Sequence, residues 1–161
     1  MNKLMTHIVA GYPTLQKSVK YILELDSIGV DYIEIQIPFS DPIADGKPIQ
    51  EASQIALQNG VTPKKILREL SKIQNKINAE LAIMTYYNII YNYGTVEFCL
   101  DCKKADIKSI IAPDMPIDEE SQENYFKTLA NHKLNSIQVI SPLTTKTRLK
   151  KILPFAQKFI Y

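Results

Sequence analysis

The chain alternates short runs rich in β-branched residues with longer segments whose apolar residues recur every three or four positions. In the run from residue 32 to residue 37, isoleucines at 33, 35 and 37 alternate with Tyr32, Glu34 and Gln36, which is the two-residue period of a β-strand. Apolar residues at positions 15, 19, 22 and 23 instead have helical spacing. This alternation predicts consecutive βα units and a parallel sheet.

The same patterns give approximate bounds for each element. Strands are expected at residues 6–10, 32–37, 79–85, 109–112 and 135–141, with a sixth strand starting at 159–161. Helices are expected from residue 15, over 48–59, from 63, over 95–104, from Asp118 to about 131, and from Thr145 to about 156. Thr14, Thr62, Asp118 and Thr145 are expected as helix N-caps because their side-chain oxygens can accept an orphan backbone N–H.

Glu34 shares a strand face with Gln36, opposite the three isoleucines. If the isoleucine face packs against helices, Glu34 points to the other side of the sheet, where a lone carboxylate is costly to bury without a partner or a task. A loop from residue 38 to 46, which contains Asp45, follows at the carboxyl end of this strand. Open α/β sheets and barrels both place their chemistry at that end.

Length and composition indicate one globular domain over residues 1–161, since 45% of the residues are hydrophobic. Nineteen basic and seventeen acidic residues leave a formal charge of +2, which gives no indication of a nucleic-acid or membrane surface. No apolar stretch approaches the ~20 residues that span a bilayer, and the first residues lack a signal-peptide core. A cytoplasmic protein is therefore expected.

Cys99 and Cys102 form a C-x-x-C pair inside a predicted helix. A redox pair would be expected at a helix N-terminus after a strand, and a zinc site would need two more ligands from a chain whose only histidines are His7 and His132. We therefore expect buried or half-buried structural cysteines and no metal site.

The string P-F-S-D-P-I-A-D-G at residues 38–46, which follows G-V-D-Y-I-E-I, resembles the signature of the tryptophan synthase α subunit family. These lyases split indole-3-glycerol phosphate into indole and glyceraldehyde 3-phosphate. Further matching segments lie at residues 10–13, 49–52, 60–62, 84–88, 112–116 and 159–161, so the resemblance extends along nearly the whole chain.

The resemblance implies an α/β fold of the (β/α)8 TIM-barrel type. Such a barrel typically takes about 250 residues, whereas this chain supplies about five βα units and the start of a sixth strand. We therefore expect a single partial barrel domain over residues 1–161. The loops after strands 7 and 8, which frequently hold a substrate phosphate, would be missing, and the chain alone is expected to have little activity.

Cleaving this substrate needs a general acid near the indole C3 atom, a base for the departing hydroxyl proton, and a group that stabilises charge at the ring nitrogen. Two carboxylates in different environments suit this division. Glu34, on an apolar strand, should have a raised pKa and exchange protons, whereas Asp45, on a polar loop, should stay ionised and accept the indole N–H. The resemblance implies the same catalytic pair.

The resemblance implies further roles by position. Tyr161 matches a family tyrosine at the active site, and Asp41 and Pro42 lie on the loop that faces the β subunit in the family, with Asp41 as a possible relay. Three residues match positions that line the indole pocket, although ordinary core residues would look the same: Met84, Ile111 and Pro113.

The chain also departs from the family pattern. Gln36 replaces an expected glycine, which would narrow the pocket or alter the pKa of Glu34. Lys47 adds a cation that would keep Asp45 ionised. His7 occupies a position that is usually apolar or aromatic, and no role as a base is expected for it.

The sequence therefore predicts a carbon–carbon lyase component of tryptophan biosynthesis. The chain would need no cofactor of its own, because the pyridoxal phosphate belongs to the β subunit, its expected partner in an α2β2 complex. The main alternative is a non-catalytic half-barrel that binds or modulates that subunit. A different phosphosugar enzyme with the same barrel would have to explain the residue 38–46 loop by coincidence.

Overall fold

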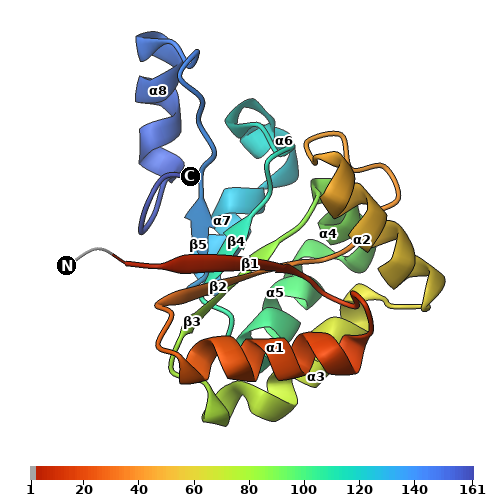
Figure 1. Cartoon of the computed structure of the whole chain (residues 1–161). Coiled ribbons are helices and arrows are strands. Elements are labelled where there is room, and N and C mark those ends of the chain that lie inside the picture. The colour runs from red at the N-terminus through yellow and green to blue at the C-terminus, as the bar shows by residue number, and fades with distance from the viewer. Residues whose placement is uncertain (1–2) are drawn as a thin grey trace.

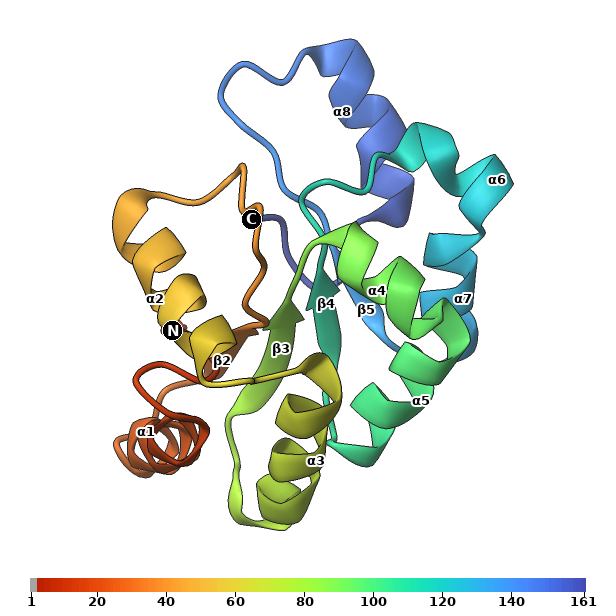
Figure 2. The ribbon, with the colours of Figure 1, turned by 90° about the vertical axis from the view of Figure 1, so that its right-hand side faces the viewer.

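The computed structural model describes residues 3–161, in which five parallel strands form one sheet. The strands pair in chain order, each with the next, and helices connect them (Figures 1 and 2). Their bounds are β1 Met5–Val9, β2 Tyr32–Gln36, β3 Glu80–Met84, β4 Ser109–Ile111 and β5 Asn135–Ile137. The predicted succession of βα units is confirmed.

The helices begin largely where the sequence places them. Thr14, Thr62 and Thr145 each accept a backbone N–H from the residue three positions later, so these three predicted N-caps are confirmed. The α-helices are α1 Leu15–Ser27, α2 Lys47–Gln58, α3 Pro63–Ile73, α4 Tyr87–Tyr93, α5 Thr95–Lys104, α6 Glu120–Glu123, α7 Tyr125–Asn131 and α8 Lys146–Ile152, with 3-10 turns at Gln74–Lys76, Ile117–Glu119 and Leu153–Phe155.

The single helix expected from Asp118 to residue 131 is wrong. The segment comprises a 3-10 turn, α6 and α7, because Asn124 between the two helices adopts a left-handed backbone with φ of 51°. Asparagine tolerates this conformation better than most residues, and one such residue interrupts a right-handed helix. Asp118 caps no helix, and its carboxylate instead pairs with Arg148.

Three other elements differ from the expectation by more than one residue. The helix α4 was not predicted, and it ends where Gly94 has a positive φ of 90°. Strand β5 ends at Ile137 rather than near residue 141. Helix α8 gives way to a 3-10 turn that contains Pro154, which has no N–H to continue the α-helical hydrogen bonds.

The two faces of the sheet have different partners. Ile33, Ile35 and Ile37 are fully buried in a core that they share with apolar residues of the surrounding helices. The opposite, inner face carries Glu34 and Gln36, also buried. On it, a smaller apolar cluster comprises Ala82, Met84, Tyr86, Ile111 and Ile137, with Phe39 and Phe159 packed against it.

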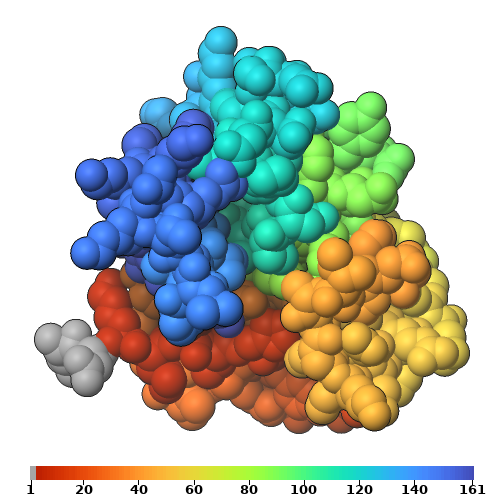
Figure 3. Space-filling view, turned by 90° about the horizontal axis from the view of Figure 1, so that it is seen from above, coloured from red at the N-terminus to blue at the C-terminus, as the bar shows by residue number. Residues whose placement is uncertain are grey.

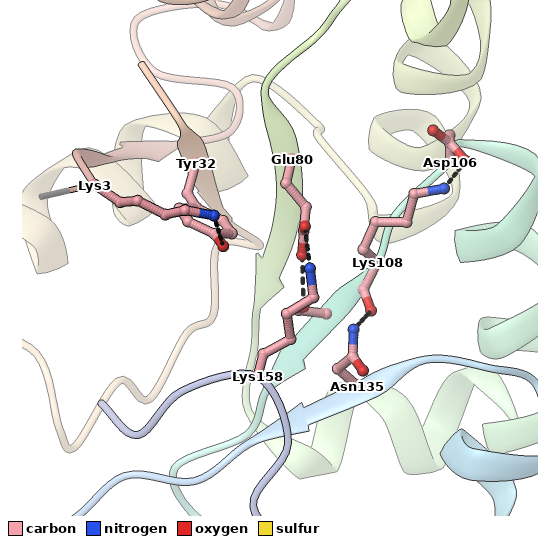
Figure 4. Close-up of polar contacts among 8 residues, drawn as sticks. Lys3, Tyr32, Glu80, Asp106, Lys108, Asn135 and Lys158 are labelled. Atoms are coloured by element: carbon pink, nitrogen blue, oxygen red, sulfur yellow. Dashed lines mark hydrogen bonds and ion pairs between the residues drawn. The ribbon is translucent and has the colours of Figure 1, made fainter. Parts of the chain in front are cut away.

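Residues 156–161 return along β5, where a sixth strand was expected. They form one parallel bridge, between Ile160 and Gln138, and the Tyr161 N–H donates to the Gln138 carbonyl at 2.9 Å. The ammonium of Lys158 pairs with Glu80 at the start of β3 (Figure 4). The rings of Phe159 and Tyr32 meet edge to face at 5.6 Å. These contacts join the last segment to the first residues of β2 and β3.

Cys99 and Cys102 lie in α5 as expected, and both are buried and free. Burial raises the pKa of the Cys99 thiol to about 11 and that of Cys102 well above its usual value. Both thiols therefore stay protonated at neutral pH, which suits a packing role rather than a reactive one. Across residues 3–161, no helix is both long enough and apolar enough to cross a bilayer.

Gly11 provides a test of how the turn after β1 is packed. Its φ is 98°, and an added Cβ atom would lie 2.7 Å from Cγ2 of Val61 and 2.9 Å from Cβ of Ala56. Gly11→Ala should therefore lower the free energy of unfolding by about 1–2 kcal/mol for the backbone and a further ~1–3 kcal/mol for overpacking.

Gly29→Ala is the matched control, because Gly29 has a similar φ of 83° but no atom within 4 Å of an added Cβ. Urea denaturation of both variants measures the difference. Equal destabilisation by the two substitutions would contradict the tight packing of Gly11.

Candidate active site

A cavity of about 300 Å³ opens on the inner face of the sheet, near the carboxyl ends of the strands. In Figure 3, the segments that follow β2 (orange), β4 (cyan) and β5 (blue) lie around one face of the molecule. The cavity is lined by His7, Glu34, Gln36, Ala44, Asp45, Ile49, Met84, Ile111, Pro113, Val139 and Tyr161. Residues from four strands and from three of the loops that follow them therefore meet at one site.

The structure brings six of the predicted site residues together in this cavity: Glu34, Asp45, Met84, Ile111, Pro113 and Tyr161. It does not bring Asp41 or Pro42 there. Asp41 is exposed and accepts a hydrogen bond from Ser40 Oγ at 2.5 Å, and Pro42 lines a separate surface hollow beside α2. These two residues therefore lie outside the cavity.

Glu34 is only 4% exposed, and burial raises the pKa of its carboxyl group. The nearby charge of Asp45 raises this pKa further, while His7 and a hydrogen bond from the Tyr161 hydroxyl oppose the shift. Its Oε2 atom is buried and has no hydrogen-bond partner among the described residues. Glu34 is thus a carboxyl group that holds its proton more tightly than usual and has one free oxygen.

Asp45 is held by two side chains that donate to the same oxygen. Nε2 of Gln36 lies 2.7 Å from Asp45 Oδ2, and the hydroxyl of Tyr86 lies 3.1 Å from it. The hydrogen bonds within residues 3–161 include none to Asp45 Oδ1. One carboxylate oxygen is therefore occupied by the protein, and the other can accept a donor from a bound molecule.

Tyr86 is a site residue that the sequence analysis did not assign. Its side chain is 1% exposed. The hydroxyl oxygen accepts a hydrogen bond from the Ala44 N–H at 2.9 Å, and the hydroxyl group donates one to Asp45. Burial raises the pKa of Tyr86 to about 12, so the hydroxyl remains a donor at neutral pH. Its place two residues after β3, at the carboxyl end, was the available signal.

Gln36 faces the cavity beside Glu34, as expected, but it does more than occupy space. Its Oε1 lies 2.8 Å from Nε2 of His7, so one amide links His7 to Asp45. The same His7 nitrogen lies 4.0 Å from Oε1 of Glu34. Lys47 was expected to place a cation beside Asp45. The ion pairs found within residues 3–161 include none between these two residues.

The arrangement combines a proton donor, an acceptor for an N–H group and an apolar wall. Met84 and Ile111 are buried in the inner cluster and, with Pro113 and Val139, form that wall. The cavity volume lies at the low end of the range for small-molecule sites, which suits a ring system of modest size. Within residues 3–161, no cluster of three or more His, Cys, Asp or Glu side chains could hold a metal ion.

Comparison with known proteins gives one consistent family. The family model described as "Tryptophan synthase alpha chain" matches residues 1–161. The tryptophan synthase alpha chain of Petrotoga mobilis is 43% identical over 158 residues, which cover 98% of this chain and 60% of the relative.

Solved structures agree. The tryptophan synthase subunit alpha of Legionella pneumophila superposes with a TM-score of 0.93 at 29% identity, covering 99% of this chain and 60% of that one. A chain of the tryptophan synthase complex of Pyrococcus furiosus gives 0.92 at 31% identity, covering 99% and 65%. The predicted TIM-barrel type is therefore confirmed.

The chain spans about 60% of the length of the curated relatives it matches. The match nevertheless covers every residue of the chain, and the solved relatives have the same arrangement of strands and helices. The chain belongs to the tryptophan synthase alpha chain family.

Proposed function

We propose that the protein carrying this chain is a lyase that cleaves indole-3-glycerol phosphate to indole and glyceraldehyde 3-phosphate, with Glu34 and Asp45 as its catalytic pair. The observation that supports this most strongly is the meeting of both carboxyl groups in one cavity with an apolar wall. The membership of the chain in the alpha chain family supports the same substrate.

The environments of the two carboxyl groups support different roles for them. The buried Glu34, whose pKa is raised, supplies a proton to C3 of the indole ring. The positive charge that then develops at the ring nitrogen strengthens the hydrogen bond from the N–H to Oδ1 of Asp45. The bond between C3 and the glycerol carbon breaks, and its electron pair restores the indole ring.

The cycle closes at the same glutamate. As the bond breaks, the adjacent hydroxyl group becomes an aldehyde, and its proton returns to the Glu34 carboxylate. The products are indole and glyceraldehyde 3-phosphate, and Glu34 is again protonated. Tyr161 is a supporting residue, because it lines the same cavity and its hydroxyl group lowers the pKa of the Glu34 carboxyl group. Met84, Ile111 and Pro113 hold the apolar ring.

A β subunit is the proposed partner, in an α2β2 complex in the cytoplasm, and the pyridoxal phosphate of the overall pathway would belong to that subunit. The loop that carries Asp41 and Pro42 is the proposed contact surface for this subunit. The exposure of an apolar side chain on the loop supports this, since Ile43 is 86% exposed. A purely non-catalytic half-barrel is not favoured, since binding alone would not require a buried, unpartnered carboxyl oxygen on Glu34.

One prediction concerns Glu34 as the proton donor. Glu34→Gln should lower the rate of indole release from indole-3-glycerol phosphate by about 10²–10⁴-fold, because the amide cannot exchange the proton. Glu51→Gln, on the exposed part of α2, is the matched control and should leave the rate unchanged. An unaltered rate in Glu34→Gln would exclude this glutamate as the acid.

Another prediction concerns the pH dependence of the contribution of Glu34 to the stability of the fold. Because the pKa of Glu34 is raised in the folded state, the native chain binds this proton more tightly than the unfolded chain. The contribution of Glu34 is therefore most favourable below its unfolded pKa and is lost as the pH rises through its folded pKa. Relative to the parent chain, Glu34→Gln should gain stability on going from pH 4 to pH 7.

Thermal unfolding followed by circular dichroism at both pH values measures this difference, with Glu51→Gln as the control that should show none. A variant that instead loses stability relative to the parent as the pH rises would show that the buried carboxylate is favourably paired.

A further inference from the structure

We propose that Gln36 is a positioning residue of this active site, which orients the Asp45 carboxylate and holds the proton of His7 away from Glu34. This inference rests on the proposed function and adds to it the residue that keeps the two carboxyl groups in different states. The proposal is supported by three distances among four side chains in the cavity, those of His7, Glu34, Gln36 and Asp45.

The orientation of the Gln36 amide follows from its neighbours. Nε2 lies 2.7 Å from Asp45 Oδ2, and Oε1 lies 2.8 Å from Nε2 of His7. An ionised carboxylate only accepts hydrogen bonds, so the NH₂ group must face Asp45. The carbonyl oxygen then faces His7, and because a carbonyl cannot donate, the Nε2 atom of His7 must carry the proton.

The surroundings make this amide rigid. Gln36 is 1% exposed and is the last residue of β2, so both its backbone and its side chain are fixed. Burial also makes both hydrogen bonds expensive to break, because an amide left without partners in the interior loses its solvation. The amide thus acts as a rigid link between β1, which carries His7, and the loop after β2, which carries Asp45.

The first consequence is for Asp45. Gln36 and Tyr86 both donate to Oδ2, which turns the carboxylate about that oxygen and leaves Oδ1 for the N–H of a bound ring. Without Gln36, only the longer bond of 3.1 Å from Tyr86 remains. The carboxylate would then rotate, and the acceptor for the ring nitrogen would lose its fixed direction.

The second consequence is for Glu34. His7 and Glu34 are register partners on adjacent strands, and Nε2 of His7 lies 4.0 Å from Oε1 of Glu34. A small movement would allow this N–H to donate to Glu34 and favour its ionised form. Because Gln36 accepts the N–H instead, the Glu34 carboxyl group remains free to give its proton to the substrate.

The unmodified chain provides the first test. Two-bond ¹H–¹⁵N correlation spectra of ¹⁵N-histidine-labelled chain at pH 8 report the tautomer of each neutral imidazole, and His7 should carry its proton on Nε2. His132 is an internal control with the opposite state, since its Nδ1 lies 2.8 Å from the Thr128 carbonyl and must carry the proton. Observation of the Nδ1–H tautomer, or a mixture, for His7 would overturn the inference.

Variants separate the link from general packing. Gln36→Leu should raise the Nδ1–H population of His7 to that of an imidazole without a fixed partner, because nothing then holds the proton on Nε2. Gln138→Leu, which removes another buried glutamine whose amide bonds to Ser136, should leave this population unchanged. Gln36→Glu keeps an acceptor for His7 but places a carboxylate against Asp45, so it should keep the tautomer. An Nδ1–H population that is the same in Gln36→Leu as in the unmodified chain would contradict the link.

Ligand binding tests the Asp45 half of the inference. Titration with indole and with 1-methylindole, which lacks the N–H, should show a preference for indole. This preference should fall by about 10-fold or more in Gln36→Leu and Gln36→Glu, because Asp45 is then no longer held in the direction that accepts the ring N–H. A preference unchanged in both variants would overturn the role of Gln36 in orienting Asp45.

The two proposals fail in different ways. If the unmodified chain did not discriminate between the two indoles, the role of Asp45 in the proposed function would be contradicted, and with it the orienting role of Gln36. The histidine spectra would still decide the His7 link. Normal discrimination together with the wrong His7 tautomer would contradict the inference and leave the proposed function standing.

Discussion

The structure depends on how strand β2 distributes its side chains between two buried faces. Three isoleucines occupy the face that the helices cover, and they are completely buried. Because side chains alternate along a strand, Glu34 and Gln36 must point to the inner face together. A shift of one residue in the register would move the isoleucines to the inner face and place the polar residues among the helices, so the hydrophobic core holds the glutamate in place.

A carboxyl group confined in this way has a limited choice of states. It can bind a proton, pair with a cation or be left charged at a high cost in solvation. Among residues 3–161, those that line the cavity include no lysine or arginine, and the one candidate cation in this set, His7, is bonded to Gln36. Asp45 differs because it is only half-buried, on the loop after β2, and receives two donors. Two groups of the same chemistry therefore have different surroundings, which suits them to the different roles that we propose.

Local patterns in the sequence predicted the parts of the fold that depend on local physics. The alternation at residues 32–37 gave the orientation of Glu34, and the threonines at 14, 62 and 145 gave three helix starts. The break at Asn124 was missed because only its backbone conformation distinguishes it from an ordinary helical asparagine. The short helix α4 was missed because its Tyr- and Asn-rich sequence has weak helix propensity.

The contacts that complete the site could not be read in the same way. Tyr86 reaches Asp45 across 41 positions in the chain, and His7 reaches Gln36 across 29. Such contacts depend on the register of three strands and on the path of one loop, which a pattern of apolar residues does not specify. The glutamine at position 36 appeared from the sequence to be a bulky replacement, and only its geometry shows that it has two partners.

A crystal structure of the chain with indole bound would test the central claim most directly. The account predicts the ring in the cavity against Met84 and Ile111, with its N–H about 2.7–3.2 Å from Oδ1 of Asp45 and its C3 atom facing the carboxyl group of Glu34. A ring bound elsewhere, or one in this cavity with its N–H turned away from Asp45 and C3 away from Glu34, would contradict it.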